Sequence, residues 1–191
     1  MNGRQTVRKL TESAILVALG FVLSYVRIKF LAYGGSITAL SMLPILLIGY
    51  RCGILWGLGS GVVYGLLQAL QEGSLAPPAS GLGEYFAMMA LDYVFAFGVL
   101  GLSALFRKSR CGLAVSSVVC LSLRYVCHIA SGVILWGSYA WEGWAVWPYS
   151  IAYNGTFMLP EIIFTTAAAY LMTRYIPARY IPARYIQPLK K

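Results

Sequence analysis

The chain has 191 residues, of which 59% are hydrophobic and only 11% are charged, and its mean hydropathy is +0.71. Soluble domains carry about a quarter charged residues, and a globular protein this short has no core large enough to bury so much apolar surface. The net charge of +9 does not indicate nucleic-acid binding, because the basic residues lie at the ends of apolar runs. The composition therefore predicts a protein whose partner is membrane lipid.

Six apolar segments follow one another along the chain. They lie at 11–27, 36–50, 53–72, 83–106, 112–136 and 148–173. None alternates between apolar and polar residues as a barrel strand does, so they predict an all-α integral membrane protein, a bundle of six transmembrane helices. The second segment is short and is interrupted by Pro44. We expect one domain over 1–174, followed by a basic, proline-containing cytoplasmic tail at 175–191.

Lysine and arginine lie almost entirely on one side of this predicted bundle. Arg27 and Lys29 lie on the opposite side, and Arg124 lies inside the fifth segment. The other basic residues share one side: Arg4, Arg8, Lys9, Arg51, Arg107, Lys108, Arg110, Arg174, Arg179, Arg184, Lys190 and Lys191. Because basic loops stay inside the cell, this pattern predicts a multi-pass plasma-membrane protein with both termini in the cytoplasm.

Small residues recur at helical spacing in two segments. Ala14 and Ala18 form an AxxxA pattern in the first segment, and Gly57, Gly61 and Gly65 form two overlapping GxxxG patterns in the third. Both patterns allow helices to approach closely. We interpret the glycines as packing within the bundle.

Motifs for other kinds of chemistry are missing from the sequence. The four cysteines form neither a CxxC pair nor a Cys/His metal spacing, so we expect no disulfide, no metal and no cofactor. There is no GxxxxGK[ST] motif, so we expect no ATPase in this chain. GxSxG and HExxH are also missing, which argues against an enzyme.

Three ionisable residues stand out inside predicted membrane spans: Asp92, Arg124 and His128. Glu84 and Glu161 are weaker cases because they lie nearer the ends of their segments. A charged side chain at the bilayer centre costs about 3 kcal/mol or more, so such residues are candidates for function. Arg124, His128, Gly132 and Trp136 recur every four residues and therefore lie along one side of the fifth helix. Gly132 predicts a gap on that side, where a flat ligand approaches the exposed backbone. The alternative is a purely structural ion pair between Asp92 and Arg124.

Aromatic residues concentrate between the fifth and sixth segments. They are Tyr139, Trp141, Trp144, Trp147, Tyr149 and Tyr153, and Asn154 follows them. An asparagine offers a donor and an acceptor to the edge of a heterocycle. Aromatic faces beside a carboxylate suit a flat organic cation. The residues therefore predict an outward-opening pocket for a small, flat, cationic ring compound.

Four stretches resemble the thiamine-specific S components, which are the substrate-binding membrane subunits of energy-coupling-factor (ECF) vitamin importers. The stretches are LTESAILVALGF, GGSITALSMLPI, LDYVFAFGVLGLSALFRK and YVCHIASGVILWGSYAWEGWAVWPYSIAYNG. They extend from about residue 10 to about residue 170. The resemblance implies a six-helix bundle whose vitamin site is built from spans four to six and capped by the loop between spans one and two.

The resemblance also implies individual residue roles. Ala14 and Ala18 would dock the transmembrane partner subunit. Ligand contacts would come from Asp92, Tyr93, Arg124, His128, Gly132, Trp136, Tyr149 and Asn154, with Tyr33 and Tyr64 as further aromatic neighbours. The capping loop RIKFLAYGGS has no tryptophan, so Tyr33 is a substitute there. Glu84 also precedes a tyrosine, but LDYVFAF aligns without gaps and favours Asp92 as the site acid.

On this resemblance we expect the chain to bind extracellular thiamine for import by an ECF transmembrane subunit and two ATPase subunits. Three alternatives stay open. The ligand could be a thiamine precursor or another vitamin. The chain could be a solitary proton-coupled carrier with Asp92, Arg124 and His128 as a relay. It could also be an intramembrane enzyme.

Overall fold

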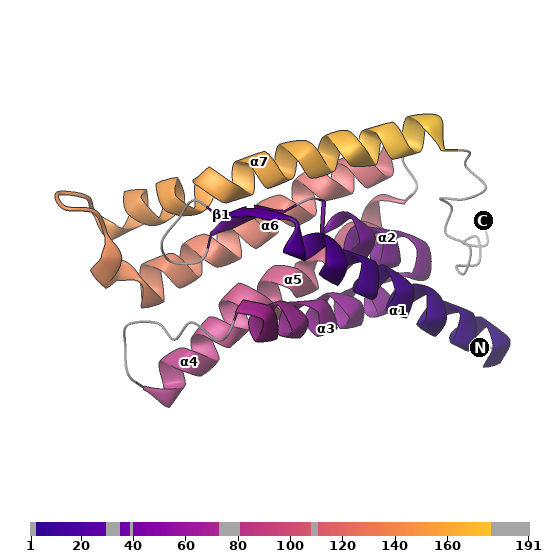
Figure 1. Cartoon of the computed structure of the whole chain (residues 1–191), viewed down its shortest axis with the longest axis horizontal. Coiled ribbons are helices and arrows are strands. Elements are labelled where there is room, and N and C mark those ends of the chain that lie inside the picture. Colours follow the sequence, from indigo (N-terminus) through magenta and orange to yellow (C-terminus); the bar gives the residue numbers. More distant parts are fainter. Residues whose placement is uncertain (1–2, 30–34, 39, 73–80, 108–110, 177–191) are drawn as a thin grey trace.

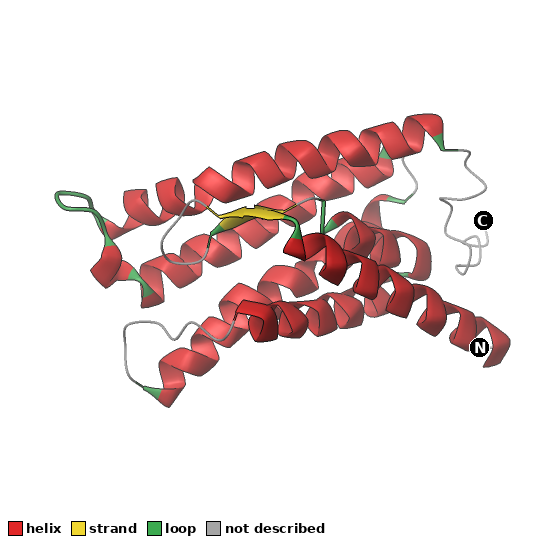
Figure 2. Ribbon diagram, viewed as in Figure 1, coloured by secondary structure: helices red, strands yellow, loops and turns green. Residues whose placement is uncertain are grey.

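The computed structural model describes residues 3–29, 35–38, 40–72, 81–107 and 111–176. Most of these residues are helical (Figures 1 and 2). The elements in chain order are α1 (Gly3–Tyr25), β1 (Arg27–Lys29), β2 (Ser36–Thr38), α2 (Leu43–Cys52), α3 (Ile54–Glu72), α4 (Leu82–Met88), η1 (Met89–Phe95), α5 (Ala96–Gly98), η2 (Val99–Phe106), α6 (Gly112–Leu135), η3 (Gly137–Tyr139) and α7 (Val146–Tyr175). Tyr33, and the predicted tail from residue 177 onward, lie outside the described residues.

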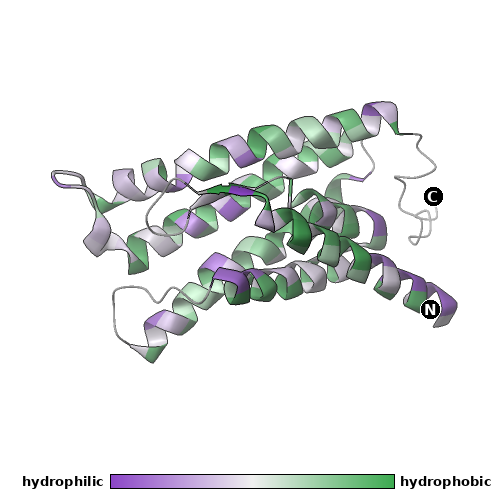
Figure 3. Ribbon diagram, in the orientation of Figure 1, coloured by the Kyte–Doolittle hydropathy of each residue, from purple (hydrophilic) through white to green (hydrophobic). Residues whose placement is uncertain are grey.

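Four helical stretches among the described residues are long and apolar enough to cross a membrane. They are α3, the continuous stretch Leu82–Phe106, α6 and α7. Large apolar side chains stand exposed on them, such as Leu55 at 80%, as is expected where lipid replaces water. The predicted third to sixth segments match these stretches to within a few residues. Figure 3 shows the hydrophobic colouring along the helices, with hydrophilic residues gathered at the start of α1.

The second predicted segment is not one helix, and this corrects the expectation for 36–50. Its first residues form β2, which pairs antiparallel with β1 and places Ile37 opposite Ile28. The helix α2 begins only at Leu43 and has ten residues, which span about 15 Å. Pro44 lies in the first turn of α2, where its missing N–H costs no helical hydrogen bond. The proline therefore begins the helix and does not interrupt one.

The glycines of α3 pack against the stretch Leu82–Phe106. A Cβ atom at Gly57 would lie 2.9 Å from the carbonyl oxygen of Gly101. One at Gly61 or Gly65 would collide with the carbonyl oxygen of Phe97 or Tyr93. Only glycine permits this approach, and the contacts agree with packing within the bundle.

The stretch Leu82–Phe106 changes its type of helix at residues that are predicted to contact the ligand. It passes from an α-helix into π-helical turns at Met89–Phe95 and ends as a 3-10 helix at Val99–Phe106. A π-helical turn inside an α-helix is rare and is frequent at functional sites. Here it carries Asp92 and Tyr93.

The two ends of the molecule differ. The start of α1 and the end of α7 lie at the same end (Figure 1). The connection between α6 and α7 and the start of α4 lie at the opposite end. The helices α6 and α7 run side by side, and β2 packs against α7. The hairpin thereby forms one wall of a cavity between α7, α6, η1 and α3.

Candidate ligand-binding pocket

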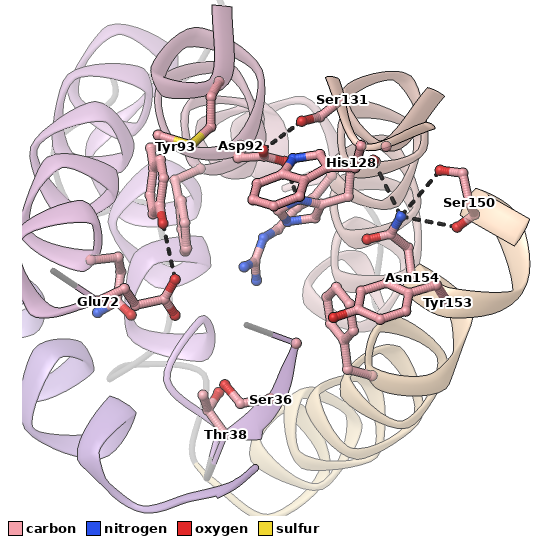
Figure 4. Close-up of a pocket in the computed structure, with 18 of the residues that line it drawn as sticks. Ser36, Thr38, Glu72, Asp92, Tyr93, His128, Ser131, Ser150, Tyr153 and Asn154 are labelled. Atoms are coloured by element: carbon pink, nitrogen blue, oxygen red, sulfur yellow. Dashed lines mark hydrogen bonds and ion pairs between the residues drawn. The ribbon is translucent and has the colours of Figure 1, made fainter. Parts of the chain in front are cut away.

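The structure brings eight of the predicted site residues together around one cavity. They are Asp92, Tyr93, Arg124, His128, Gly132, Trp136, Tyr149 and Asn154. Figure 4 labels four of them, with Asp92 and Tyr93 of η1 on one side and His128 of α6 and Asn154 of α7 on another, and shows Ser36 and Thr38 of the hairpin facing both. The four-residue period of α6 thus corresponds to one wall of the pocket.

Asp92 is held by two side chains of α6. Its Oδ1 lies 2.8 Å from Nδ1 of His128, and Ser131 donates a hydrogen bond from Oγ to Oδ2 at 2.5 Å (Figure 4). His128 and Ser131 lie one turn apart, so both oxygens of the carboxylate are fixed toward α6. The other ring nitrogen of His128, Nε2, is buried and has no hydrogen-bond partner among the described residues. Its hydrogen-bonding capacity is therefore not used by the described residues.

Arg124 is buried, at 8% exposed, and lines the same pocket. Its Cζ lies 4.1 Å from the centroid of the Phe97 ring, and its Nη1 contacts the sulfur of Met42. In the described part of the chain, the carboxylate of Asp92 hydrogen-bonds the ring of His128, and no ion pair joins it to Arg124. The alternative of a structural Asp92–Arg124 pair therefore has no counterpart in the geometry.

Asn154 and Gly132 lie where α6 and α7 pack against each other. Nδ2 of Asn154 donates to the carbonyl oxygen of Ser150 at 2.9 Å and lies 3.3 Å from that of His128. The amide nitrogen is thus used within the protein, and Oδ1 is the atom left for a ligand. A Cβ at Gly132 would collide with Oγ of Ser150 and lie 3.2 Å from Nδ2 of Asn154. Gly132 therefore makes room for α7, whereas the sequence pattern predicted an open gap for the ligand.

A second carboxylate, which the sequence analysis missed, faces Asp92 across the pocket. Glu72, the last residue of α3, accepts a hydrogen bond from the hydroxyl of Tyr93 at 2.9 Å (Figure 4). Its other oxygen lies 3.6 Å from Nη1 of Arg27 on β1. Gln68 and Glu72 also line the pocket, and they continue the face of α3 that carries Gly61 and Gly65. Their spacing from these glycines was the feature of the sequence that could have identified Glu72 as a pocket residue.

The structure places Tyr64 outside the lining of this pocket. Its side chain is 0% exposed, its ring packs edge-on against Phe97 at 5.2 Å, and its hydroxyl donates to the carbonyl oxygen of Gly20 at 3.3 Å. Tyr64 therefore supports a lining residue from behind. Further lining residues that the sequence analysis did not single out are Ser131, Ser150, Phe157, Met42 and Met88.

The charges that line the pocket leave it complementary to a cation. Among the described lining residues, Asp92 and Glu72 carry carboxylates and Arg124 carries a guanidinium, so two negative charges and one positive charge leave one net negative charge when His128 is neutral. Trp136, Tyr149 and Phe157 add aromatic faces. A pocket with this lining suits a small organic monocation with flat rings.

Apolar helices of membrane-spanning length around such a pocket define a membrane protein that binds a small organic molecule. The chain belongs to the thiamine transporter protein family (Thia_YuaJ), whose model matches residues 10–180.

Relatives and a solved structure agree with this assignment. The chain is 35% identical to the thiamine transporter ThiT of Bacillus subtilis, with 85% of this chain and 88% of that protein covered. It is 27% identical to ThiT of Lacticaseibacillus paracasei, with 81% of each chain covered. The solved structure of ThiT from Listeria monocytogenes has the same fold, with a TM-score of 0.77 over 93% of this chain and 99% of that one, at 24% identity.

Proposed function

We propose that this protein binds thiamine outside the cell and delivers it, as the S component of an ECF importer, to partner subunits in the plasma membrane. One observation carries the proposal: Asp92, His128, Trp136 and Asn154, which the sequence singled out separately, face one pocket with a net negative charge. Thiamine is a monocation made of two flat rings. Membership of the thiamine transporter family supports the same ligand.

The geometry supports a separate role for each side of the pocket. Trp136 and the ring of His128 flank the thiamine rings, and each stacking contact adds about 1 kcal/mol beyond area burial. Asp92 complements the positive charge or the aminopyrimidine. Oδ1 of Asn154, whose nitrogen is already committed to α7, and Tyr149 contact the pyrimidine edge. Other vitamins would leave these buried polar groups unpaired, which is the basis of specificity.

The orientation proposed for the membrane is that of six crossings with both termini in the cytoplasm. The shared end of α1 and α7 in Figure 1 supports this arrangement, as does the distribution of basic residues. In it, α1 and the short α2 together with β2 supply the first two crossings. The pocket then faces outward, toward the connection between α6 and α7.

Partner docking is proposed for the outer face of α1. Ala14 and Ala18 are both exposed, and so are the neighbouring Ile15, Leu19 and Val22. A face of small and apolar residues suits a helix of another membrane subunit. The sequence has no P-loop motif, so the energy for uptake would come from two ATPase subunits bound to a transmembrane partner. The chain itself would not act as an enzyme.

A binding titration tests the site. Thiamine is added to the purified protein in detergent, and tryptophan fluorescence reports saturation. Trp136→Ala and Asp92→Asn should each weaken binding at least tenfold, because a stacking face or a charge-assisted contact is lost. Trp147→Ala is the matched control, since Trp147 is exposed on α7 and outside the pocket lining. Wild-type affinity in both pocket variants would place the ligand elsewhere.

Competition and uptake experiments separate the alternatives. An aminopyrimidine precursor that displaces thiamine at equal concentration would favour a precursor as the ligand. Uptake by the chain alone, abolished by a protonophore, would favour a solitary proton-coupled carrier. Recovery of chemically unchanged thiamine after incubation would exclude an enzyme acting on it.

A further inference from the structure

A buried carboxylate outside the pocket lining holds the strand β2 against α7. Glu161 lies in the middle of α7 and is 1% exposed. Its Oε1 accepts hydrogen bonds from both the backbone nitrogen of Thr38 at 2.5 Å and the Oγ1 of Thr38 at 2.6 Å. Oγ1 of Thr38 also lies 2.7 Å from Oγ of Ser41. Thr38 and Ser41 line the pocket, so Glu161 fixes one pocket wall from behind.

Glu161 differs from an ordinary core residue because its buried side chain carries a carboxyl group that is only partly hydrogen-bonded. Burying an ionised carboxyl group in an apolar span is costly unless every lone pair is satisfied. The second oxygen of Glu161, Oε2, is buried and has no hydrogen-bond partner among the described residues. The hydrogen-bonded oxygen of Glu161, Oε1, therefore serves to hold the hairpin wall at Thr38.

A second polar contact of the hairpin is weaker. Arg27 of β1 lies 3.6 Å from Glu72 at the end of α3, and both side chains are partly exposed. Ion pairs of that kind contribute about 0–1 kcal/mol. Hydrogen bonds from a backbone N–H and a hydroxyl to a buried carboxylate are stronger. The contact between Glu161 and Thr38 is therefore the stronger of these two polar contacts between the described hairpin residues and the helices.

A bound ligand that is mostly enclosed leaves only when a wall of its pocket moves. The hairpin wall is a short two-stranded sheet, whereas the opposite walls belong to long, packed helices. We propose that Glu161 is a positioning residue which, by holding Thr38 on α7, sets the rate at which the pocket opens and thiamine dissociates. This inference rests on the proposed thiamine site.

Stopped-flow measurement of tryptophan fluorescence tests the proposal, because it separates association from dissociation. Glu161→Gln, which replaces a charged acceptor by a neutral one, and Thr38→Val, which removes the hydroxyl at nearly constant volume, should each raise the dissociation rate about five- to tenfold. The association rate should stay within about twofold. The double variant should be no faster than the faster single variant, since both changes break one contact.

Matched controls make the same substitutions elsewhere. Thr165→Val changes a buried threonine one turn further along α7, outside the pocket lining. Glu142→Gln changes an exposed glutamate in the connection between α6 and α7. Both controls should keep the wild-type dissociation rate within about twofold.

A readout without ligand keeps the two proposals apart. In the ligand-free protein, Glu161→Gln should speed hydrogen exchange at the Thr38 amide about tenfold, because this amide donates to Glu161. If the wild-type protein binds no thiamine, the proposed function fails, and the exchange rate still tests the contact between Glu161 and Thr38. If thiamine binds but both variants keep the wild-type dissociation rate, or if only their thermal stability falls, Glu161 is a structural residue and the inference is overturned.

Discussion

Replacing Gly132 by alanine should damage thiamine binding through a single added methyl group. The new Cβ would collide with Oγ of Ser150 and lie 3.1 Å from its Cβ and 3.2 Å from Nδ2 of Asn154. Because α7 must then shift or Ser150 must leave its hydrogen bond to the carbonyl oxygen of Ile129, the cost is that of overpacking, about 1–3 kcal/mol. If the strain falls on the pocket, thiamine affinity drops about 5- to 150-fold.

Isothermal titration calorimetry together with a melting curve measures both consequences. Strain that falls on folding and not on binding should lower the melting temperature by about 2–4 °C for each kcal/mol. Adding Ser150→Gly to Gly132→Ala removes the obstructing side chain and should restore part of the loss. Gly59→Ala is the matched control, because a Cβ there would meet no described atom within 4 Å. Wild-type affinity and stability in Gly132→Ala would refute the packing argument.

Three further substitutions have expected outcomes. Tyr64→Phe should change thiamine affinity less than about threefold, because its hydroxyl bonds Gly20 and not the pocket; a titration showing a tenfold loss would contradict this. Glu72→Gln should weaken thiamine about tenfold but a neutral analogue much less, since it removes the net negative charge; equal losses in competition binding would argue against charge complementarity. Gly61→Ala should lower thermal stability by about 1–3 kcal/mol, because its Cβ meets the backbone at Phe97; an unchanged melting curve would oppose this.

The wall of the pocket on α6 could be predicted because it depends on one helix alone. Arg124, His128 and Trp136 recur at the helical period, and this spacing places them on one side of α6 whatever packs against that helix. Asp92 could be singled out as an acid inside an apolar run, but its pairing with His128 instead of Arg124 depends on how η1 faces α6, which no local pattern records.

The parts that the sequence did not predict depend on contacts between elements distant in the chain. Glu72 is the last residue of an apolar helix, at the edge of the predicted span, and only the approach of η1 to the glycines of α3 makes it face Tyr93. The strand at Ser36–Thr38 forms because Arg27–Lys29 lies beside it. Without that partner in view, the residues from Ser36 onward looked like the start of a helix. Gly132 looked like an opening because Ser150 lies on another helix.

The π-helical turns at Met89–Phe95 set how the side chains after them are rotated about the helix axis relative to the side chains before them. Removing one residue there would leave a span of almost the same length and apolarity, still able to cross a bilayer. Every side chain beyond the deletion would nevertheless turn by about 100° relative to those before it. Asp92 could then no longer face α6 while the residues that pack against α3 keep their contacts. The hydropathy profile would not show the change, yet the pocket residues and the packing residues of this helix would no longer be aligned with each other.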